Sequence, residues 1–260
     1  MKKATIAFWV LLAGLILLIP LSSIAAEKQG EKAPLQEIEK EKDKDKQASS
    51  GDESKKEKTA TSVRMPVYKP PRRGAPAGRL AGGTRGAEDQ MPFLCVLSPD
   101  HVGLTIQGQP SLYWYISEIP RHDIEFTIIR FWGIQPLLET RLDLPAQAGV
   151  QTIRLSDYDI RLQPGEQYKW YVALVPDRER RSKDVVTGGL IERRELSPAL
   201  RARLKEVNKE EAVYIYAEAG IWYDALSSVS ELIEAAPDNL VFQKQRAFLL
   251  QQVGLSQIAQ

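Results

Sequence analysis

One stretch sets the expected fold: Leu162-Gln163-Pro164-Gly165-Glu166-Gln167-Tyr168-Lys169-Trp170-Tyr171-Val172-Ala173-Leu174. Its proline and glycine supply the fixed and the permissive backbone angles of a tight turn. After the turn, side chains alternate with period two, as in a strand that is buried on one face. A tyrosine directly after such a corner, with its hydroxyl returned to nearby backbone, is typical of immunoglobulin-like and fibronectin-like sandwiches. The stretch therefore predicts an antiparallel β-sandwich, with these side chains on its inner face: Tyr168, Trp170, Val172 and Leu174.

Other segments between residues 91 and 195 alternate in the same way. Predicted strands include 93–97, 103–106, 112–116, 124–128, 138–142, 151–155 and 184–194. Seven or eight short strands, separated by Pro, Gly and Asp, favour one β-sandwich domain over a βαβ fold. The same alternation directs Tyr113, Tyr115 and Tyr171 away from the face that carries Trp114 and Trp170.

The hydrophobic period changes from residue 196, so residues 196–260 are predicted to be a C-terminal helical segment. Ser197-Pro198 is typical of a helix start. Apolar stripes then run from Leu200 past Asn208 to Ala217, from Ile221 to Ala236, and from Asp238 to Gly254. A tetratricopeptide-like hairpin is indicated by the spacing of Tyr216, Gly220, Ala225 and Pro237. One and a half repeats are too few for an independent solenoid, so we expect the hairpin to pack on the sandwich or on another protein's repeats.

Three segments of different composition precede residue 91. Residues 1–26 have a basic start, an apolar centre and a small-residue exit, which predicts a secretory signal peptide or, alternatively, a membrane anchor. Residues 27–64 alternate Lys with Glu or Asp and are expected to be a disordered charged linker. Residues 65–90 are rich in Pro, Gly and Arg, which predicts an extended arm or a flexible linker. We therefore expect an extracytoplasmic protein, periplasmic or secreted, with membrane contact only if the N-terminal segment is uncleaved.

Charge and cysteine content narrow the class of protein further. The formal net charge is +1, so no overall field attracts nucleic acid, and none is expected as a partner. Cys95 is the only cysteine, which rules out an internal disulfide. It lies in the apolar run 93–97, where a small buried hydrophobe is a better interpretation than a reactive or intermolecular thiol.

Several stretches, taken in order, resemble one family of exported bacterial proteins. They are Gly82-Gly83-Thr84-Arg85-Gly86, Gly103-Leu104-Thr105, Pro110, Tyr113-Trp114-Tyr115, Glu125-Phe126-Thr127, Leu162 to Trp170, Arg181-Ser182-Lys183-Asp184 and Gly220-Ile221-Trp222-Tyr223-Asp224-Ala225-Leu226. Over about residues 78–236 the chain is similar to the domain of unknown function 928 family, best represented in cyanobacteria. Relatives often carry a cysteine pair that this chain lacks, so the resemblance implies no disulfide here. The resemblance implies no catalytic residue.

No motif in the chain predicts catalysis, a metal site or a cofactor. His101, His122 and Asp123 do not have the spacing of a metal box, and are interpreted as surface-loop residues. Residues 82–86 lack the Lys-Ser/Thr end of a phosphate-binding loop. The charge run 177–184 predicts a solvated hairpin, with an anion-binding loop as the alternative. A carboxylate pair for glycoside hydrolysis would be set by folding rather than by spacing, and stays open.

Two functional hypotheses remain at this stage. The first is a non-catalytic cell-envelope interaction module that binds an envelope protein. The second is a carbohydrate-binding module, or a weak hydrolase, acting on envelope polysaccharide. The candidate partner-binding residues are Tyr113, Tyr115, Tyr171, Arg72, Arg73, Arg85, Trp222 and Tyr223. An open row of tyrosines would favour the polysaccharide. A row covered by the helices, with Trp222 and Tyr223 as contacts, would favour the protein partner.

Overall fold

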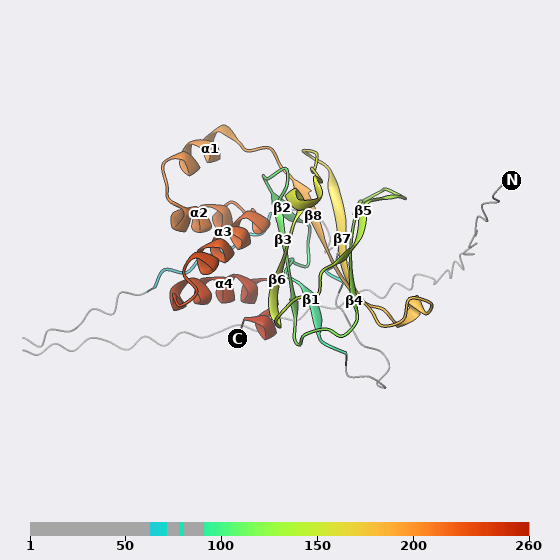
Figure 1. Cartoon of the computed structure of the whole chain (residues 1–260). Coiled ribbons are helices and arrows are strands. Elements are labelled where there is room, and N and C mark those ends of the chain that lie inside the picture. Colours follow the sequence, from blue (N-terminus) through green and yellow to red (C-terminus); the bar gives the residue numbers. More distant parts are fainter. Residues whose placement is uncertain (1–62, 72–77, 81–90, 260) are drawn as a thin grey trace, which may run out of the picture. The chain divides into compact units, whose positions relative to one another are not determined.

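Two β-sheets packed face to face form the centre of the described part of the chain (Figure 1). The structure is a computed structural model that describes residues 63–71, 78–80 and 91–259. The smaller sheet has the order β1-β3-β6, with bounds Leu94–Val96, Ser111–Ile116 and Gly149–Arg154. The larger has the order β2-β8-β7-β4-β5, with bounds Gly103–Thr105, Val185–Arg193, Gln167–Val175, Asp123–Arg130 and Pro136–Leu142. Neighbouring strands are antiparallel except β2 and β8, which run parallel.

The corner before β7 has the expected geometry. Gly165 has a φ of +78°, which a residue with a side chain rarely adopts. The backbone N–H of Gln163 donates a hydrogen bond of 2.9 Å to the hydroxyl oxygen of Tyr168. The predicted inner-face side chains are all buried: Tyr168, Trp170, Val172 and Leu174. The period-two pattern therefore identified the buried face of this strand correctly.

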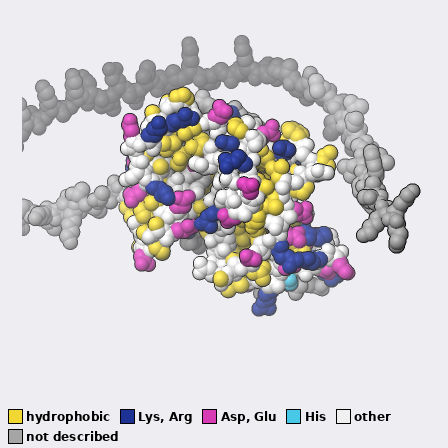
Figure 2. Space-filling model, turned by 45° about the horizontal axis from the view of Figure 1, so that its top comes forward, with side chains coloured by type: hydrophobic (Ala, Val, Ile, Leu, Met, Phe, Trp, Pro, Cys, Tyr) yellow, Lys and Arg dark blue, Asp and Glu magenta, His cyan; other side chains and the backbone are white. Residues whose placement is uncertain are grey.

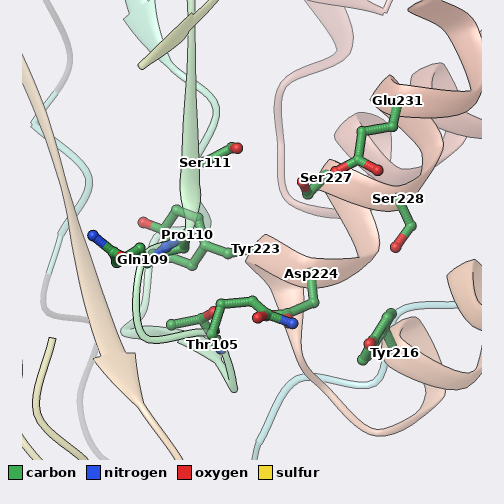
Figure 3. A pocket seen from close by; sticks show the side chains of 11 residues that line it. Thr105, Gln109, Pro110, Ser111, Tyr216, Tyr223, Asp224, Ser227, Ser228 and Glu231 are labelled. Atoms are coloured by element: carbon green, nitrogen blue, oxygen red, sulfur yellow. Dashed lines mark hydrogen bonds between the residues drawn. The ribbon is translucent and has the colours of Figure 1, made fainter. Parts of the chain in front are cut away.

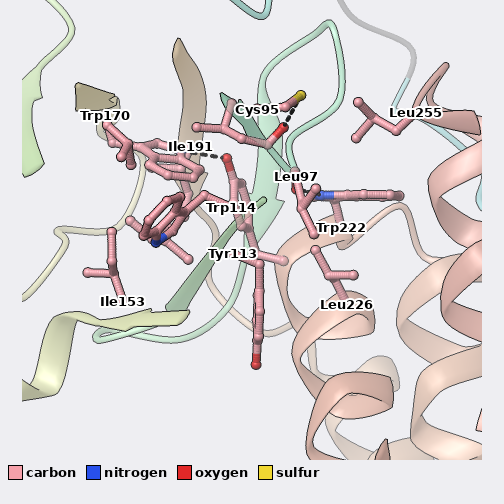
Figure 4. Close-up of a cluster of buried hydrophobic side chains, with 14 of the residues drawn as sticks. Cys95, Leu97, Tyr113, Trp114, Ile153, Trp170, Ile191, Trp222, Leu226 and Leu255 are labelled. Carbon is pink, nitrogen blue, oxygen red and sulfur yellow. Dashed lines mark hydrogen bonds between the residues drawn. The ribbon is translucent and has the colours of Figure 1, made fainter. Parts of the chain in front are cut away.

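The main core lies between the two sheets. Figure 4 shows Trp114, Ile153 and Trp170 on one side of β3, and Trp222 and Leu226 on its other side. The first group fills the space between the sheets, and the second belongs to the helical layer. Both groups are fully or almost fully buried and belong to one continuous hydrophobic cluster. The smaller sheet is therefore covered on both faces.

Four α-helices follow the strands: α1 Pro198–Lys205, α2 Lys209–Glu218, α3 Trp222–Ala235 and α4 Leu240–Gln252. Three short 3-10 helices are Leu155–Tyr158, Arg181–Lys183 and Ser256–Ile258. The apolar stripe predicted from Leu200 to Ala217 is divided between α1 and α2, because the side chain of Asn208 accepts a hydrogen bond from the N–H of Glu211 and starts a new helix. Figure 1 places α2, α3 and α4 beside the smaller sheet, away from β4 and β5. The fold is α+β and mainly β.

Two pieces of the Pro/Gly/Arg-rich segment lie against the folded part. Within 63–71, the N–H of Tyr68 donates to Oε1 of Gln252 (2.8 Å) and the N–H of Lys69 donates to the carbonyl of Ala217 (3.0 Å). Farther along, Leu80 forms a two-way backbone bridge with Gly188. These pieces have little regular structure, yet specific backbone hydrogen bonds hold them in place.

Several predictions concern residues outside the described ranges. They are the signal peptide or anchor at 1–26, the charged linker up to residue 62, and the arm at 72–77 and 81–90. In the ranges that the structure describes, no helix has the length and apolarity needed to cross a bilayer.

Candidate functional site

The seam between α3 and the sandwich is built by the block Gly220 to Leu226, and α3 meets β3 of the smaller sheet and β2 of the larger sheet. Trp222 is fully buried, and its indole N–H donates a hydrogen bond of 2.9 Å to the carbonyl of Leu97. An apolar side chain at this position would bury the same area but would leave that carbonyl without a donor. The helix is thus fixed to the sheet by one directional contact as well as by packing.

Tyr223 makes the second directional contact of the seam. Its hydroxyl accepts from the indole N–H of Trp170 (2.9 Å) and donates to the carbonyl of Leu190 (2.9 Å), while the hydroxyl of Ser98 lies 3.2 Å away. Burial raises the pKa of this phenol above its ordinary value. A Cβ at Gly103 would come within 2.6 Å of the Tyr223 ring, so glycine makes room for the ring. Three stretches that carry the family resemblance therefore meet at this tyrosine: Gly103 to Thr105, Leu162 to Trp170 and Gly220 to Leu226.

Asp224 follows in the first turn of α3 and is only 4% exposed. Its Oδ2 accepts from the backbone N–H of Ile106 at 3.2 Å. Its Oδ1 is buried and has no hydrogen-bond partner among the described residues. Burial raises the pKa of the carboxyl to about 6, and hydrogen bonding from the side chains of Thr105 and Gln107 and from the backbone N–H of Ile106 lowers it. A buried carboxylate oxygen without a donor is costly, so it marks a place where a ligand would be favourable.

Asp224 lines a pocket of about 360 Å³ between the loop after β2 and helices α2 and α3 (Figure 3). Other lining side chains include Gln107, Tyr216, Ser227 and Glu231. Ser227 donates to Glu231 (3.1 Å), whose other oxygen pairs with Lys209. Sequence reasoning placed Asp224 in the resemblance block without assigning it a role. One signal in the sequence could have identified this site: Asp224 is the only acid in the apolar and aromatic run 221–226.

The predicted row of three tyrosines does not form. Tyr113 is 2% exposed beneath α3, where its hydroxyl lies 3.5 Å from that of Ser227. Tyr115 lies on the same face and is half-buried, with its ring 6.2 Å from that of Phe93. Tyr171 lies on the outer face of the other sheet, over Gly188. The prediction that all three leave the inner face is confirmed, but two different sheets carry them, which alternation cannot reveal.

Trp222 and Tyr223, considered as partner-binding residues, are interior residues of the seam. They are 0% and 1% exposed, so no external partner can reach them in this fold. The other candidates, Arg72, Arg73 and Arg85, lie outside the described residues. Of the arginines nearby that are described, Arg64 pairs with Glu211 at 2.8 Å, and Arg79 donates to the carbonyl of Ser98 at 2.9 Å.

An exposed apolar tip, residues 131–134, joins β4 to β5. Trp132 is 90% exposed and Ile134 is 95% exposed. The ring of Phe131 meets that of Trp132 edge-on, and the ammonium of Lys169 lies 4.5 Å from the Phe131 ring centroid. The sequence reading passed over this tip, although an apolar Phe-Trp-Gly-Ile segment between two strands was an available signal.

The charge run 177–184 forms the turn between β7 and β8, and its arginines are paired within the fold. Arg178 bonds Asp123 at 2.7 Å, while Arg181 bonds Glu125 at 2.6 Å and Asp184 at 2.8 Å. Hydrogen bonding from Arg181 lowers the pKa of Glu125. Figure 2 shows basic and acidic side chains intermingled at the lower right, over this end of the domain. Internal pairing supports the solvated hairpin rather than the anion-binding loop.

The remaining sequence candidates fall into the core and the loops. Cys95 is buried and unpaired, and burial raises the pKa of its thiol, as expected for a small hydrophobe. His101 is half-buried: its Nε2 lies 2.9 Å from the Tyr68 hydroxyl, and its ring stacks on that of Tyr68. It is therefore packed beneath the arm rather than free in a surface loop. Across the described ranges, no group of three His, Cys, Asp or Glu side chains is placed to hold a metal ion.

One family model matches most of the chain. A family model described as a domain of unknown function, DUF928, matches residues 80–260. No curated protein matches the chain. The matched span extends past residue 236, where the expected resemblance ended, and so takes in α4 together with the sandwich and the seam. The chain therefore belongs to the domain of unknown function 928 (DUF928) family.

Proposed function

We propose that this protein is an exported, non-catalytic interaction module of the cell envelope, which binds a protein partner through the exposed apolar tip. The observation that carries the proposal is the exposure of Trp132 and Ile134, at 90% and 95%. The other tryptophans in the described part, Trp114, Trp170 and Trp222, are all buried. A tryptophan exposed to water at the end of a hairpin is the kind of side chain that dominates protein interfaces.

The surroundings of the tip favour a protein over a lipid surface. A hollow of about 480 Å³ lies beside the tip, lined by Arg130, Phe131, Trp132 and Glu166 among others. Arg130 is basic and Glu166 is acidic. A protein partner can meet this pair with one acidic and one basic side chain at the edge of its own interface. The carboxylate of Glu166 would be repelled by anionic lipid headgroups. The cation–π contact from Lys169 orders the Phe131 ring, so less conformational entropy is lost on binding.

We also propose the finer fold assignments. The order β1-β3-β6 facing β4, β7 and β8 as neighbours matches strands A-B-E facing C-F-G of the immunoglobulin and fibronectin class, and the hydroxyl contact of Tyr168 supports it. For the tetratricopeptide-like hairpin, the support is the left-handed Gly220 between α2 and α3 and the buried Ala225. Both architectures commonly present binding surfaces, which is an analogy at the level of fold.

The test is a pull-down from envelope extract with the immobilised protein. We expect a partner that the parent protein retains and that Trp132→Ala/Ile134→Ala loses. Leu240→Ala is the matched control, because Leu240 is also a large exposed hydrophobe, at 62%, but lies at the start of α4. Equal recovery by the parent and the double variant would refute the proposal, as would no reproducible partner in either extract or cross-linked cells.

A further inference from the structure

The pocket at the seam has a chemical character that the proposed function does not use. Its described lining contains carboxylate, amide and hydroxyl groups and no Lys, Arg or His. Glu231 is already compensated by Lys209. Asp224 has no cationic partner in the described part of the chain, and its buried Oδ1 has no donor. The pocket is therefore acceptor-rich, with one uncompensated acid at its inner end.

A ligand that satisfied Oδ1 and also compensated the carboxylate would bring hydrogen-bond donors and positive charge. An ammonium supplies both, because it has three N–H donors and cancels the charge of a buried carboxylate. A neutral polyol would satisfy Oδ1 but would leave the charge in place. The ring of Tyr216, which also lines the pocket, can attract a cation through its face. The volume of about 360 Å³ is at the small end of ligand sites.

We propose that this pocket binds a small primary amine, with its ammonium group held by Asp224 and its remaining polar atoms by Gln107 and Ser227. The site lies at the seam of the helices and the smaller sheet, and the apolar tip lies at the end of the β4–β5 hairpin. The two proposals therefore stand or fall separately. Asp224 also lies in the first turn of α3, where the helix dipole stabilises a negatively charged carboxylate. That role accounts for its charge, but not for the oxygen that lacks a donor.

Isothermal titration of the full chain with putrescine, ethanolamine and glucosamine tests the proposal, with 1,4-butanediol as the uncharged analogue of putrescine and Ca²⁺ as a competing cation. We expect at least one amine to bind at millimolar concentration or below, and the diol not to bind. Asp224→Asn should weaken that binding by at least about tenfold. Glu234→Gln, which removes an exposed acid of the same helix that does not line the pocket, should leave the affinity unchanged.

A second variant guards against loss of folding in Asp224→Asn. Ser228 lines the pocket and is half-buried, so Ser228→Phe should fill the space and abolish binding while the circular dichroism spectrum is retained. Several results would overturn the proposal: no amine binds, the diol binds as tightly, Ca²⁺ binds in place of the amines, or Asp224→Asn keeps the parental affinity. None of these results affects the pull-down that tests the apolar tip.

Discussion

The two outer faces of the sandwich carry similar side chains but have different surroundings. Tyr113 on the smaller sheet is covered by α3 and is 2% exposed. Tyr171 on the larger sheet rests on Gly188 and stays half-buried, and the described helices α2, α3 and α4 lie beside the other sheet (Figure 1). Both tyrosines alternate with a buried tryptophan in their own strand. Alternation therefore determines which side chains share a face, and a distant segment of the chain determines which face is covered.

The tryptophans show the same contrast. Trp222 at the seam is fully buried and hydrogen-bonded to Leu97, whereas Trp132 at the tip is almost fully exposed. The first belongs to the interior and contributes to stability, and the second is available for binding. Substituting a seam residue and a surface residue of the same type tests this division.

The largest expected effect is on Trp222. Trp222→Ala should lower the free energy of unfolding by about 3–5 kcal/mol, because it leaves a cavity and an unpaired carbonyl at Leu97. Trp132→Ala should change it by less than about 0.5 kcal/mol. Urea denaturation followed by circular dichroism measures both. If the two variants lost similar stability, the division between seam and tip would be wrong.

The next effect concerns pH. Burial raises the pKa of Asp224 to about 6, above its unfolded value near 3.8, so the folded state holds the proton more tightly. Its contribution to stability is complete below about pH 4 and is lost as the pH rises through about 6, by at most roughly 3 kcal/mol. Asp224→Asn should remove this decline. The unfolding free energies of the parent and of Asp224→Asn are measured at about pH 4 and at about pH 7. If the gap between the two proteins were the same at both pH values, the raised pKa of Asp224 would be wrong.

A smaller effect is expected at Tyr223. Tyr223→Phe removes the hydroxyl that bonds both Trp170 and Leu190, so two buried groups lose a partner at a cost of about 1–3 kcal/mol. Tyr171→Phe is the matched control on the uncovered face and should cost less than about 0.5 kcal/mol. Thermal unfolding of the two variants side by side distinguishes them, and equal melting temperatures would count against the hydrogen-bonded seam.

The smallest difference separates two glycines with almost the same backbone angle. Gly220 and Gly254 have φ of +73° and +74°, so alanine at either costs about 1–2 kcal/mol of backbone strain. A Cβ at Gly220 would also lie 2.6 Å from the carbonyl oxygen of Lys69, while one at Gly254 meets nothing within 4 Å. Gly220→Ala should therefore cost on the order of 1 kcal/mol more than Gly254→Ala. Identical losses in chemical denaturation would mean that the arm does not rest on this turn.

Much of the fold could be predicted because its signals are local. The turn at Pro164-Gly165 and the alternation after it identified the inner face of β7, and Ser197-Pro198 marked the start of α1. The division of the stripe at Asn208 was missed because a capping asparagine competes with a continuous apolar pattern. The candidate sites were predicted less well. Asp224 and Trp132 were passed over because the burial of one and the exposure of the other depend on segments far away in the chain.

The strands, their inner faces, the helical tail and the family resemblance follow from the order of the amino acids, because turn chemistry and side-chain period act over a few residues. Three other features appear only in the folded chain: α3 covers Tyr113, Tyr171 stays half-buried on the other sheet, and Asp224 lines a pocket with one carboxylate oxygen unsatisfied. Those outcomes depend on which surfaces meet when the helices dock on the sheet, and docking is set by shape and hydrogen-bond complementarity between segments distant in the chain.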